Sequence, residues 1–215
     1  MTTYDIEVRG AGIVGRCLAL SLARLGLSVA LRPQAQRPPG ADDVRAYALN
    51  AASVALLRGL KVWDALPAHA ATPVYDMQVQ GDAPGAGIDF SAWDQRVGEL
   101  AWIVDAAVLE RELGAAVRFA PHVTVVDADT AVSATLLALC EGKASATRDS
   151  LGVAFERHDY GHRAIAARLS TTQPHQGIAR QWFRSPDVLA LLPFDTPTPG
   201  ASYALVWSLP DERAA

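Results

Sequence analysis

The sequence lacks any apolar run of about 18 residues, the length that a membrane-spanning helix needs. It also lacks a basic run, since 19 Lys and Arg stand against 23 Asp and Glu for a formal net charge of −4. This balance argues against nucleic acid as a partner. The N-terminal MTTYDIEVRG does not have the charged-then-apolar layout of a signal peptide. We therefore expect a cytoplasmic protein with at most a peripheral membrane association.

Cysteine is scarce, and several catalytic motifs are missing. Cys17 and Cys140 both stand in apolar contexts, which predicts reduced core thiols rather than a disulfide framework. No HExxH motif or close Cys/His cluster occurs, so we expect no metal site. The GxSxG elbow of hydrolases and the P-loop are absent as well.

What is present predicts an α/β fold. The 215 residues are 50% hydrophobic and can bury a real core in one large domain or two small ones. Residues 4–9 alternate like a strand, 10–15 are a glycine-rich turn, 13–27 have helical spacing, and 27–31 are again strand-like. This β–turn–α–β order predicts parallel strands.

Further elements follow from local signals. The Pro/Gly-rich stretch 33–42 predicts a loop. We expect a helix at 46–60, capped near Asn50 or Ser53, and a second helix at 105–118 that begins at Asp105. We expect strands at 76–81 and 87–90, and a buried strand at 134–140. From about residue 155, alternation at 163–170 and 201–209 predicts an antiparallel sheet.

The turn has the GxGxxG spacing, between a strand and a helix as that motif requires. Gly10 permits the tight turn, Gly12 lets the backbone approach a pyrophosphate, and Gly15 lets the helix pack closely on the strand. The helix N-terminus offers N–H groups to phosphates. The candidate cofactor-binding residues are Gly10, Ala11, Gly12, Ile13, Val14 and Gly15. The alternative is a glycine turn that serves packing alone.

One part of a dinucleotide site is missing. The second strand ends Ala-Leu-Arg32-Pro-Gln34, without the carboxylate that usually holds the adenosine ribose. Either Arg32 or Gln34 holds the ribose, or the affinity is weakened. Arg32 could also be a solvated charge at the strand end.

Several blocks in order resemble one family. RGAGIVGR, DVRAYALNAASVALL, ELAWIVDAAVLE, CEGKASATRDSLGV, and DYGHRAIAARLSTTQPHQGIARQWF with LALLPF run nearly end to end. They resemble the N-terminal half of the FAD-dependent aromatic hydroxylases of the ubiquinone-biosynthesis type, relatives of p-hydroxybenzoate hydroxylase. The resemblance implies a Rossmann-like FAD-binding domain at 1–74 and 101–153, and a partial antiparallel substrate-side sheet at 75–100 and 154–215. It implies hydroxylation of an aromatic or quinone-precursor substrate with NAD(P)H and O2.

The resemblance also implies site residues outside the glycine turn. Arg45 matches an arginine near the FAD pyrophosphate, and its alternative is a surface charge. Glu141 and Gly142, with Ser145 and Arg148, match a second motif near the FAD diphosphate that is linked with the nicotinamide cofactor. Glu stands where the family usually has Asp, and the alternative for this segment is a turn that caps a helix at 144–150.

No catalytic residue is assigned. His175, beside Pro174, is expected to be structural or exposed, and Trp102, Trp182 and Trp207 are expected to be core or sheet-face aromatics. The family's third motif is a Gly-Asp followed by Ala-Ala/Ser-His and a Pro- and Gly-rich run, and it carries FAD contacts. It does not occur here, so we expect the C-terminal part of the family fold to be absent from this sequence. Exposed sheet edges would then invite self-association as a homo-oligomer.

Three functions remain open. The first is an FAD-dependent monooxygenase of a quinone precursor, the second a truncated, non-catalytic FAD-binding remnant, and the third an NAD(P)-dependent oxidoreductase. The third is weakest, because the blocks after residue 40 match flavin hydroxylases and no Tyr-x-x-x-Lys pair occurs.

Overall fold

The computed structural model describes residues 3–34 and 43–214, which form two compact units. The first comprises the described residues within Met1–Asp42, Leu56–Ala65 and Leu109–Arg157, and the second those within Asp43–Ala55, Leu66–Val108 and His158–Ala215. The domain boundaries expected from the sequence stay a prediction. Most of the expected Pro/Gly-rich loop at 33–42 lies outside the described residues.

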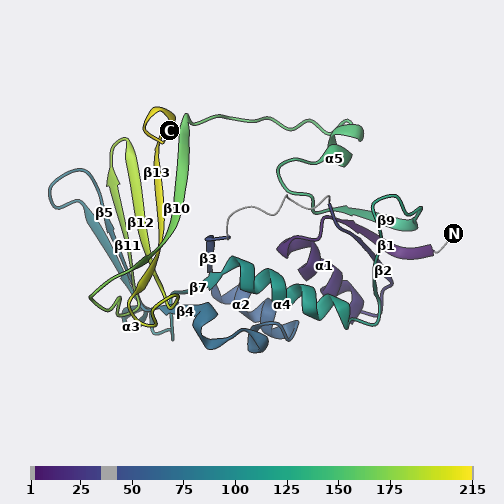
Figure 1. Cartoon of the computed structure of the whole chain (residues 1–215), viewed down its shortest axis with the longest axis horizontal. Helices are drawn as coiled ribbons and strands as arrows, with labels where there is room; N and C mark the ends of the chain where they lie inside the picture. The colour runs from purple at the N-terminus through teal and green to yellow at the C-terminus, as the bar shows by residue number, and fades with distance from the viewer. Residues whose placement is uncertain (1–2, 35–42, 215) are drawn as a thin grey trace. The chain divides into compact units, whose positions relative to one another are not determined.

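The first unit is built on a parallel sheet with the strand order β8-β2-β1-β9, and Figure 1 labels β2, β1 and β9. Strands β1 (Thr3–Arg9) and β2 (Val29–Arg32) are neighbours, and helix α1 (Ile13–Arg24) connects them. Strand β9 (Ser133–Leu139) adds beyond β1, and β8 (Val123–Val125) beyond β2, both in parallel. The expected β–turn–α–β unit is therefore confirmed.

Helix α4 (Ala106–Arg118) begins where the sequence predicts. Its Asp105 carboxylate accepts a hydrogen bond from the Val108 N–H at 3.1 Å, which satisfies one of the free donors of the first turn. Leu109, Leu113 and Val117 form its buried stripe at helical spacing. In the first unit, α1 is tied to α4 by the Arg16 guanidinium, which donates to the Glu110 carbonyl at 2.7 Å.

The helix expected at 46–60 is wrong in its first turn. Residues Ala46–Leu49 form strand β3, and helix α2 is confined to Ala51–Gly59. The side chain of Asn50 accepts from the Ser53 N–H at 2.9 Å, so the helix starts at the cap that the sequence indicated. Residues before this cap pair instead with strand β7 (Ala101–Asp105). Strand β7 lies more than 50 residues away in the sequence, so the helix propensity of residues 46–49 could not predict this pairing.

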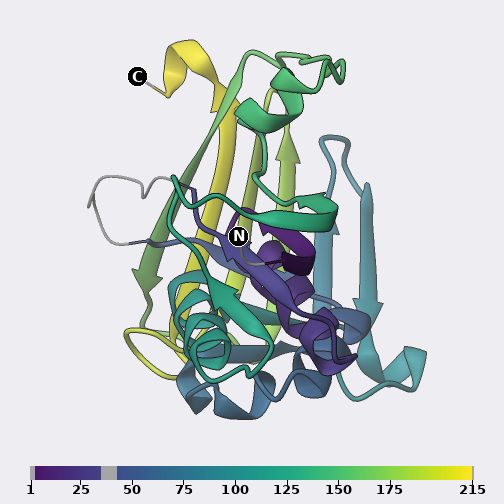
Figure 2. The same ribbon diagram turned by 90° about the vertical axis from the view of Figure 1, so that its right-hand side faces the viewer.

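The second unit combines two sheets. Strands β3, β7 and β4 (Ala71–Val74) form the smaller one, in the order β3-β7-β4. The larger has the order β10-β13-β12-β11-β5-β6, and Figures 1 and 2 show its long strands side by side. Its strands are β10 (His162–Ser170), β13 (Ser202–Pro210), β12 (Asp187–Phe194), β11 (Ile178–Arg184), β5 (Asp76–Gln80) and β6 (Gly87–Ser91).

Antiparallel pairing joins all neighbours of the larger sheet except β11 and β5, which are parallel. The expected antiparallel sheet after residue 155 is confirmed. Its core against the smaller sheet consists of aliphatic side chains and one phenylalanine, namely Val74, Ala101, Ile103, Ala179, Phe194 and Ala204. The remaining short elements are α3 (Ala92–Gln95), α5 (Ala146–Ser150), and the 3₁₀ turns η1 (Trp63–Ala65), η2 (Ala68–Ala70) and η3 (Asp211–Arg213).

Strand β9 was expected to be buried, and this is wrong. It is a strand, but it stands at the edge of the parallel sheet and pairs only with β1 among the described residues. Leu136 is 58% exposed, and Leu137 and Leu139 are each 37% exposed. An apolar run predicts a strand whether or not another layer covers it, so the run alone does not report burial. Within the described residues, no helix is both long and apolar enough to cross a bilayer.

The His162 side chain makes a contact at one end of the larger sheet that should depend on pH. The His162 ring places Nδ1 2.8 Å from the Tyr160 carbonyl and Nε2 3.2 Å from the Pro186 carbonyl. Only the imidazolium can donate to both oxygens. The Tyr160 carbonyl is the main cause of a raised His162 pKa. Desolvation opposes this rise, and the Pro186 carbonyl and the charges of Asp211 and Asp187 add to it.

His162 is therefore expected to stabilise the fold below its ordinary pKa of 6.5, and to lose this contribution as the pH rises through the raised folded pKa. Chemical denaturation of the wild type and of His162→Gln at pH 5.5 and pH 8.5 measures the effect. The stability difference between the two proteins should be larger at pH 5.5. An equal difference at both pH values would exclude the charged contact.

Candidate functional site

The glycine turn lies at the carboxyl end of β1, and its three glycines have different surroundings. Gly10 has φ +103° and its N–H donates to the Arg32 carbonyl at 2.9 Å. A Cβ on Gly10 would overlap the Cys140 carbonyl, and one on Gly15 would overlap the Gly10 carbonyl oxygen. A Cβ on Gly12 would meet no atom within 4 Å. Packing therefore requires glycine at positions 10 and 15, whereas Gly12 faces open space.

Helix α1 starts directly behind this open space. Gly12 is its N-cap and offers no side-chain cap, and the first turn carries no acidic residue. Ala11, Ile13 and Val14 complete the turn, and the Val14 side chain is exposed. The first N–H groups of a helix have no partner within the helix, and the dipole makes this end positive. The backbone here is therefore built to accept an anionic group.

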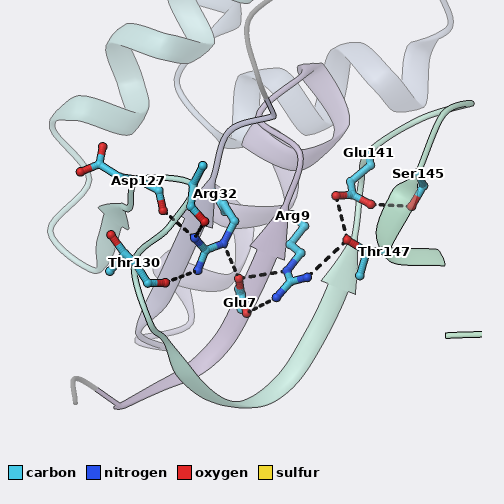
Figure 3. Close-up of polar contacts among 9 residues, drawn as sticks. Glu7, Arg9, Arg32, Asp127, Thr130, Glu141, Ser145 and Thr147 are labelled. Atoms are coloured by element: carbon cyan, nitrogen blue, oxygen red, sulfur yellow. Dashed lines mark hydrogen bonds and ion pairs between the residues drawn. The ribbon is translucent and has the colours of Figure 1, made fainter. Parts of the chain in front are cut away.

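The structure brings the Glu141 segment beside the turn. The Cys140 N–H donates to the Arg9 carbonyl at 2.6 Å, so β9 delivers Glu141 next to Gly10. The Glu141 carboxylate accepts from the Ser145 hydroxyl and from the Thr147 hydroxyl at 3.0 Å (Figure 3). Gly142 has φ +75°, a conformation that suits glycine. Glu141 therefore holds the shape of this loop.

Ser145 and Arg148 lie in the short helix that follows. Ser145 caps α5, because its hydroxyl accepts from the Arg148 N–H at 3.0 Å. The guanidinium carbon of Arg148 lies 4.0 Å from the centre of the Phe155 ring. Its Nε is buried and has no hydrogen-bond partner among the described residues. A buried donor without an acceptor is costly, so Arg148 is suited to an incoming acceptor.

A buried carboxylate organises the same strand ends. Glu7 on β1 is 6% exposed and pairs with the Arg32 guanidinium at 2.7 Å and the Arg9 guanidinium at 3.1 Å. Arg9 also donates to the Thr147 hydroxyl at 3.3 Å, which links β1 to the Glu141 loop (Figure 3). Burial opposes ionisation of Glu7, but hydrogen bonds from Arg32 and Arg9 outweigh it and lower the Glu7 pKa. Sequence reasoning missed this network, although two charges two residues apart in a central strand were the available signal.

The Arg32 guanidinium is almost fully engaged in hydrogen bonds within this network. Besides Glu7, its guanidinium donates to the carbonyls of Asp127, Ala128 and Thr130 at 2.5–2.8 Å. Four of its five donors are therefore engaged, and Arg32 is a structural ion-pair residue rather than a solvated charge. Gln34 is exposed, and its side-chain nitrogen donates to the Glu141 and Ala144 carbonyls at 3.1 and 3.3 Å. This orientation leaves the amide oxygen of Gln34 as an acceptor.

Arg45 belongs to the second unit. Its guanidinium pairs with the Asp43 carboxylate at 2.6 and 2.8 Å and lies 5.9 Å from the centre of the Tyr47 ring. Hydrogen bonds from Arg45 are the main cause of the lowered Asp43 pKa, which burial opposes and the charges of Arg45 and Arg168 support. A carboxylate therefore already holds the Arg45 guanidinium.

His175 is structural, as its context suggested. It is 7% exposed, its Nδ1 accepts from the Gly177 N–H at 3.0 Å, and its Nε2 lies 3.3 Å from Asp195. Burial opposes ionisation of Asp195, but hydrogen bonds from the Gly200 N–H, His175 and Thr72 lower its pKa overall. His175 therefore fastens the start of β11 to the loop after β12.

Two of the three tryptophans highlighted from the sequence line a cavity on the larger sheet. The cavity has a volume of about 230 Å³ and is lined by Trp182, Arg184, Asp187, Leu189 and Trp207. The Trp207 Nε1 donates to Asp187 at 3.1 Å, which fixes that indole. Trp102 lies on β7 and is half-buried. Among the described residues, no group of three metal-ligating side chains gathers at any point.

Solved structures of monooxygenases share this fold. The chain matches Pseudomonas aeruginosa PqsL, solved with 2-aminobenzoylacetate, at a TM-score of 0.80 and 19% identity over 99% of this chain and 62% of PqsL. It matches p-nitrophenol 4-monooxygenase PnpA from Pseudomonas putida at a TM-score of 0.76 and 16% identity, over 99% and 59% of the two chains. PqsL is called a probable FAD-dependent monooxygenase. The fold is thus that of FAD-dependent monooxygenases, and the predicted fold class is confirmed.

Curated relatives narrow the resemblance to ubiquinone hydroxylases. The 3-demethoxyubiquinol 3-hydroxylase of Escherichia coli is 35% identical over 125 residues, which cover 56% of this chain and 32% of that enzyme. Ubiquinone hydroxylase UbiL of Rhodospirillum rubrum is 28% identical over 228 residues, covering 95% and 51%. No family model matches the chain. The predicted resemblance is confirmed, and the chain spans about half or less of the length of these two relatives.

Proposed function

We propose that the chain binds FAD at the carboxyl ends of β1, β2 and β9. The observation that carries the proposal is the open space at Gly12, in front of the uncapped N-terminus of α1. A pyrophosphate fits such a site because the backbone N–H groups and the helix dipole both favour anionic oxygens. The fold supports FAD as the dinucleotide, because its solved neighbours include a probable FAD-dependent monooxygenase and an HpxO structure complexed with FAD.

The proposal assigns the residues around the cofactor. The backbone from Gly10 to Gly15 meets the pyrophosphate, and the unsatisfied Nε of Arg148 donates to an oxygen of the same cofactor. Glu141 and Gly142 shape the adjoining loop rather than contact phosphate, because the carboxylate is already satisfied by two hydroxyls. Arg45 is assigned to the pyrophosphate on the family resemblance.

Gln34 takes the place of the missing ribose carboxylate in this proposal. Arg32 is engaged by Glu7 and three carbonyls, so it is not the ribose ligand. The Gln34 amide oxygen, two residues beyond β2, is held as an acceptor by the contacts of its own nitrogen. A neutral amide accepts a ribose hydroxyl more weakly than a carboxylate would.

The activity that this site supports best is hydroxylation of an aromatic or quinone-precursor substrate. FAD would accept a hydride from NAD(P)H and activate O2 for the ring. The E. coli relative is named for hydroxylation of 3-demethoxyubiquinol, which supports this substrate class. The cavity between Trp182 and Trp207 is a suitable surface for a ring, since indoles offer apolar faces and stacking geometry. We also propose a cytoplasmic location, which the two free cysteines support.

Turnover assays test the activity. The chain saturated with FAD is mixed with NADH or NADPH in air, with and without phenolic quinone precursors, and products are analysed by mass spectrometry. We expect substrate-dependent NAD(P)H oxidation and a product that has gained one oxygen atom. A chain that binds FAD but never oxidises NAD(P)H would contradict the activity and favour the non-catalytic FAD-binding remnant.

A further inference from the structure

A polar cavity lies in the second unit, where the loop after β10 meets strands β11 and β13. It has a volume of about 440 Å³ and is lined by Thr171, Thr172, Gln173, Pro174, Arg180 and Tyr203. It shares no lining residue with the cavity between Trp182 and Trp207. Among the described residues that line it, none is acidic, and the Arg180 guanidinium carries the only formal charge. The cavity therefore presents one positive charge to a molecule that enters it.

The strands place Arg180 and Tyr203 on one face of the larger sheet. Their chain neighbours Ala179 and Ala204 belong to the core that the two sheets of this unit share. Because successive residues of a strand point to opposite faces, Arg180 and Tyr203 point away from that core. Strand β12 runs between β11 and β13, and across it the Arg180 Nη1 donates to the Tyr203 hydroxyl at 3.2 Å.

Arg180 differs from the other three arginines in the strands of the larger sheet. Each of those has a carboxylate or a carbonyl as an acceptor, namely Asp211 for Arg163, Asp105 for Arg168 and Gly81 for Arg184. Among the described residues, the half-buried Arg180 has only the neutral Tyr203 hydroxyl. A guanidinium carries five N–H donors, and burying a cation without a counter-ion is costly. Most donors of Arg180 are therefore left for an anionic acceptor.

The walls of the cavity are fixed by contacts within the second unit. Tyr203 is 7% exposed, and its ring meets the buried His175 ring in a T-shaped arrangement with the centroids 6.0 Å apart. The Tyr203 oxygen accepts from Arg180, and its own proton has no acceptor among the described residues, so the hydroxyl can donate to a ligand. The Thr171 N–H holds the loop by donating to the Ala201 carbonyl at 2.9 Å. Donors that are already in place lose little freedom on binding.

We propose that this cavity binds a small monocarboxylate, with the Arg180 guanidinium and the Tyr203 hydroxyl as donors to its two oxygens. The planar fork of a guanidinium matches the geometry of a carboxylate. One cation balances a single negative charge, whereas a phosphate monoester would bring up to about two. The exposed Thr172 and Gln173 side chains line the rest of the cavity, so they suit a hydroxyl group on the same molecule. The inference goes beyond the proposed function, because this site does not involve FAD.

A pair of matched ligands tests the charge that the cavity selects. Lactate is the probe, and lactamide, which has the same shape without the charge, is its control. Binding to the wild-type chain without FAD is followed by NMR at constant ionic strength, through the backbone amides of Thr172 and Gln173. We expect lactate to shift these signals saturably with a Kd on the order of 1 mM, and lactamide not to shift them. Inorganic phosphate should bind more weakly than lactate.

Three variants test the assignment of the donors. Arg180→Met should weaken lactate binding by about tenfold or more, because it removes a charge-assisted hydrogen bond. Tyr203→Phe keeps the buried ring, removes a neutral donor and should weaken binding by about threefold. Arg163→Met is the matched control, since Arg163 is an exposed arginine of the same sheet that pairs with Asp211. It should bind lactate like the wild type.

Four results would overturn the proposal. These are the absence of a saturable shift with lactate, equal binding of lactamide, tighter binding of phosphate than of lactate, and an unchanged lactate affinity in Arg180→Met. If Arg180→Met does not fold, Tyr203→Phe takes its place, and an unchanged affinity in that variant has the same meaning. Because the titrations contain no FAD, failure of the proposed cofactor site would leave their outcome unaffected.

Discussion

Gly15→Ala is expected to lower the free energy of unfolding by about 3 kcal/mol, the upper part of the range for overpacking. The added Cβ would overlap the Gly10 carbonyl oxygen and would stand 3.2 Å from the Cys140 Cβ. Both neighbours belong to strand ends that cannot move without breaking the contact between α1 and the parallel sheet. Urea denaturation followed by circular dichroism measures the change.

Gly59→Ala is the matched control for this substitution. Gly59 ends α2, and a Cβ there would meet nothing within 4 Å. Its unfolding free energy should differ from that of the wild type by less than about 1 kcal/mol. If Gly15→Ala has the same unfolding free energy as this control, the turn does not approach helix α1 as closely as the structure shows.

Glu7→Gln is expected to destabilise the chain by about 3 kcal/mol. The substitution keeps the shape of the side chain but leaves two guanidiniums without their shared carboxylate, and loss of one partner from a buried ion pair is strongly destabilising. The side chains of Glu7 and Arg32 are 8% and 13% exposed, so solvent replaces little of the lost interaction. The Arg9 side chain is 33% exposed, so solvent replaces part of its interaction with Glu7. We therefore place the expected loss of stability at the lower end of the range for breaking a buried ion pair.

The pH dependence separates this charge effect from a change in packing. Because the folded pKa of Glu7 is lowered, its contribution should be complete above its ordinary pKa of 4.5 and should decrease as the pH falls through the folded pKa. Glu112→Gln, which removes a pair with the exposed Arg111, should cost less than about 1 kcal/mol. A stability difference that does not shrink in acid would assign the effect of Glu7→Gln to packing.

Local signals were enough to predict the elements around the glycine turn. The spacing of Gly10, Gly12 and Gly15 predicted the β–turn–α–β unit, and the caps at Asn50 and Asp105 marked where α2 and α4 begin. In each case the determining interactions lie within a few residues of one another. The sequence therefore carries them in a form that spacing and residue type reveal.

Contacts between distant segments could not be predicted in this way. Residues 46–49 read as helix because Ala and Leu favour it, and only pairing with β7 makes them a strand. The exposure of β9 depends on which other elements cover the sheet, and the apolar run in β9 does not contain that information. Likewise, Arg168 reaches residues 44 and 45 from more than 120 positions away. The assignment of site residues from the sequence stays a prediction until cofactor binding is measured.

Titration of FAD into the wild type and into Gly12→Ala tests the central claim most directly, with calorimetry or flavin fluorescence as the signal. Gly12 has φ −73° and open space around its Cβ position, so the variant should fold like the wild type. The methyl group would occupy the place of the pyrophosphate, and FAD affinity should fall about tenfold or more. Gly59→Ala should bind FAD like the wild type. Equal FAD binding by Gly12→Ala and the wild type, or no binding by the wild type, would contradict a dinucleotide site at the glycine turn.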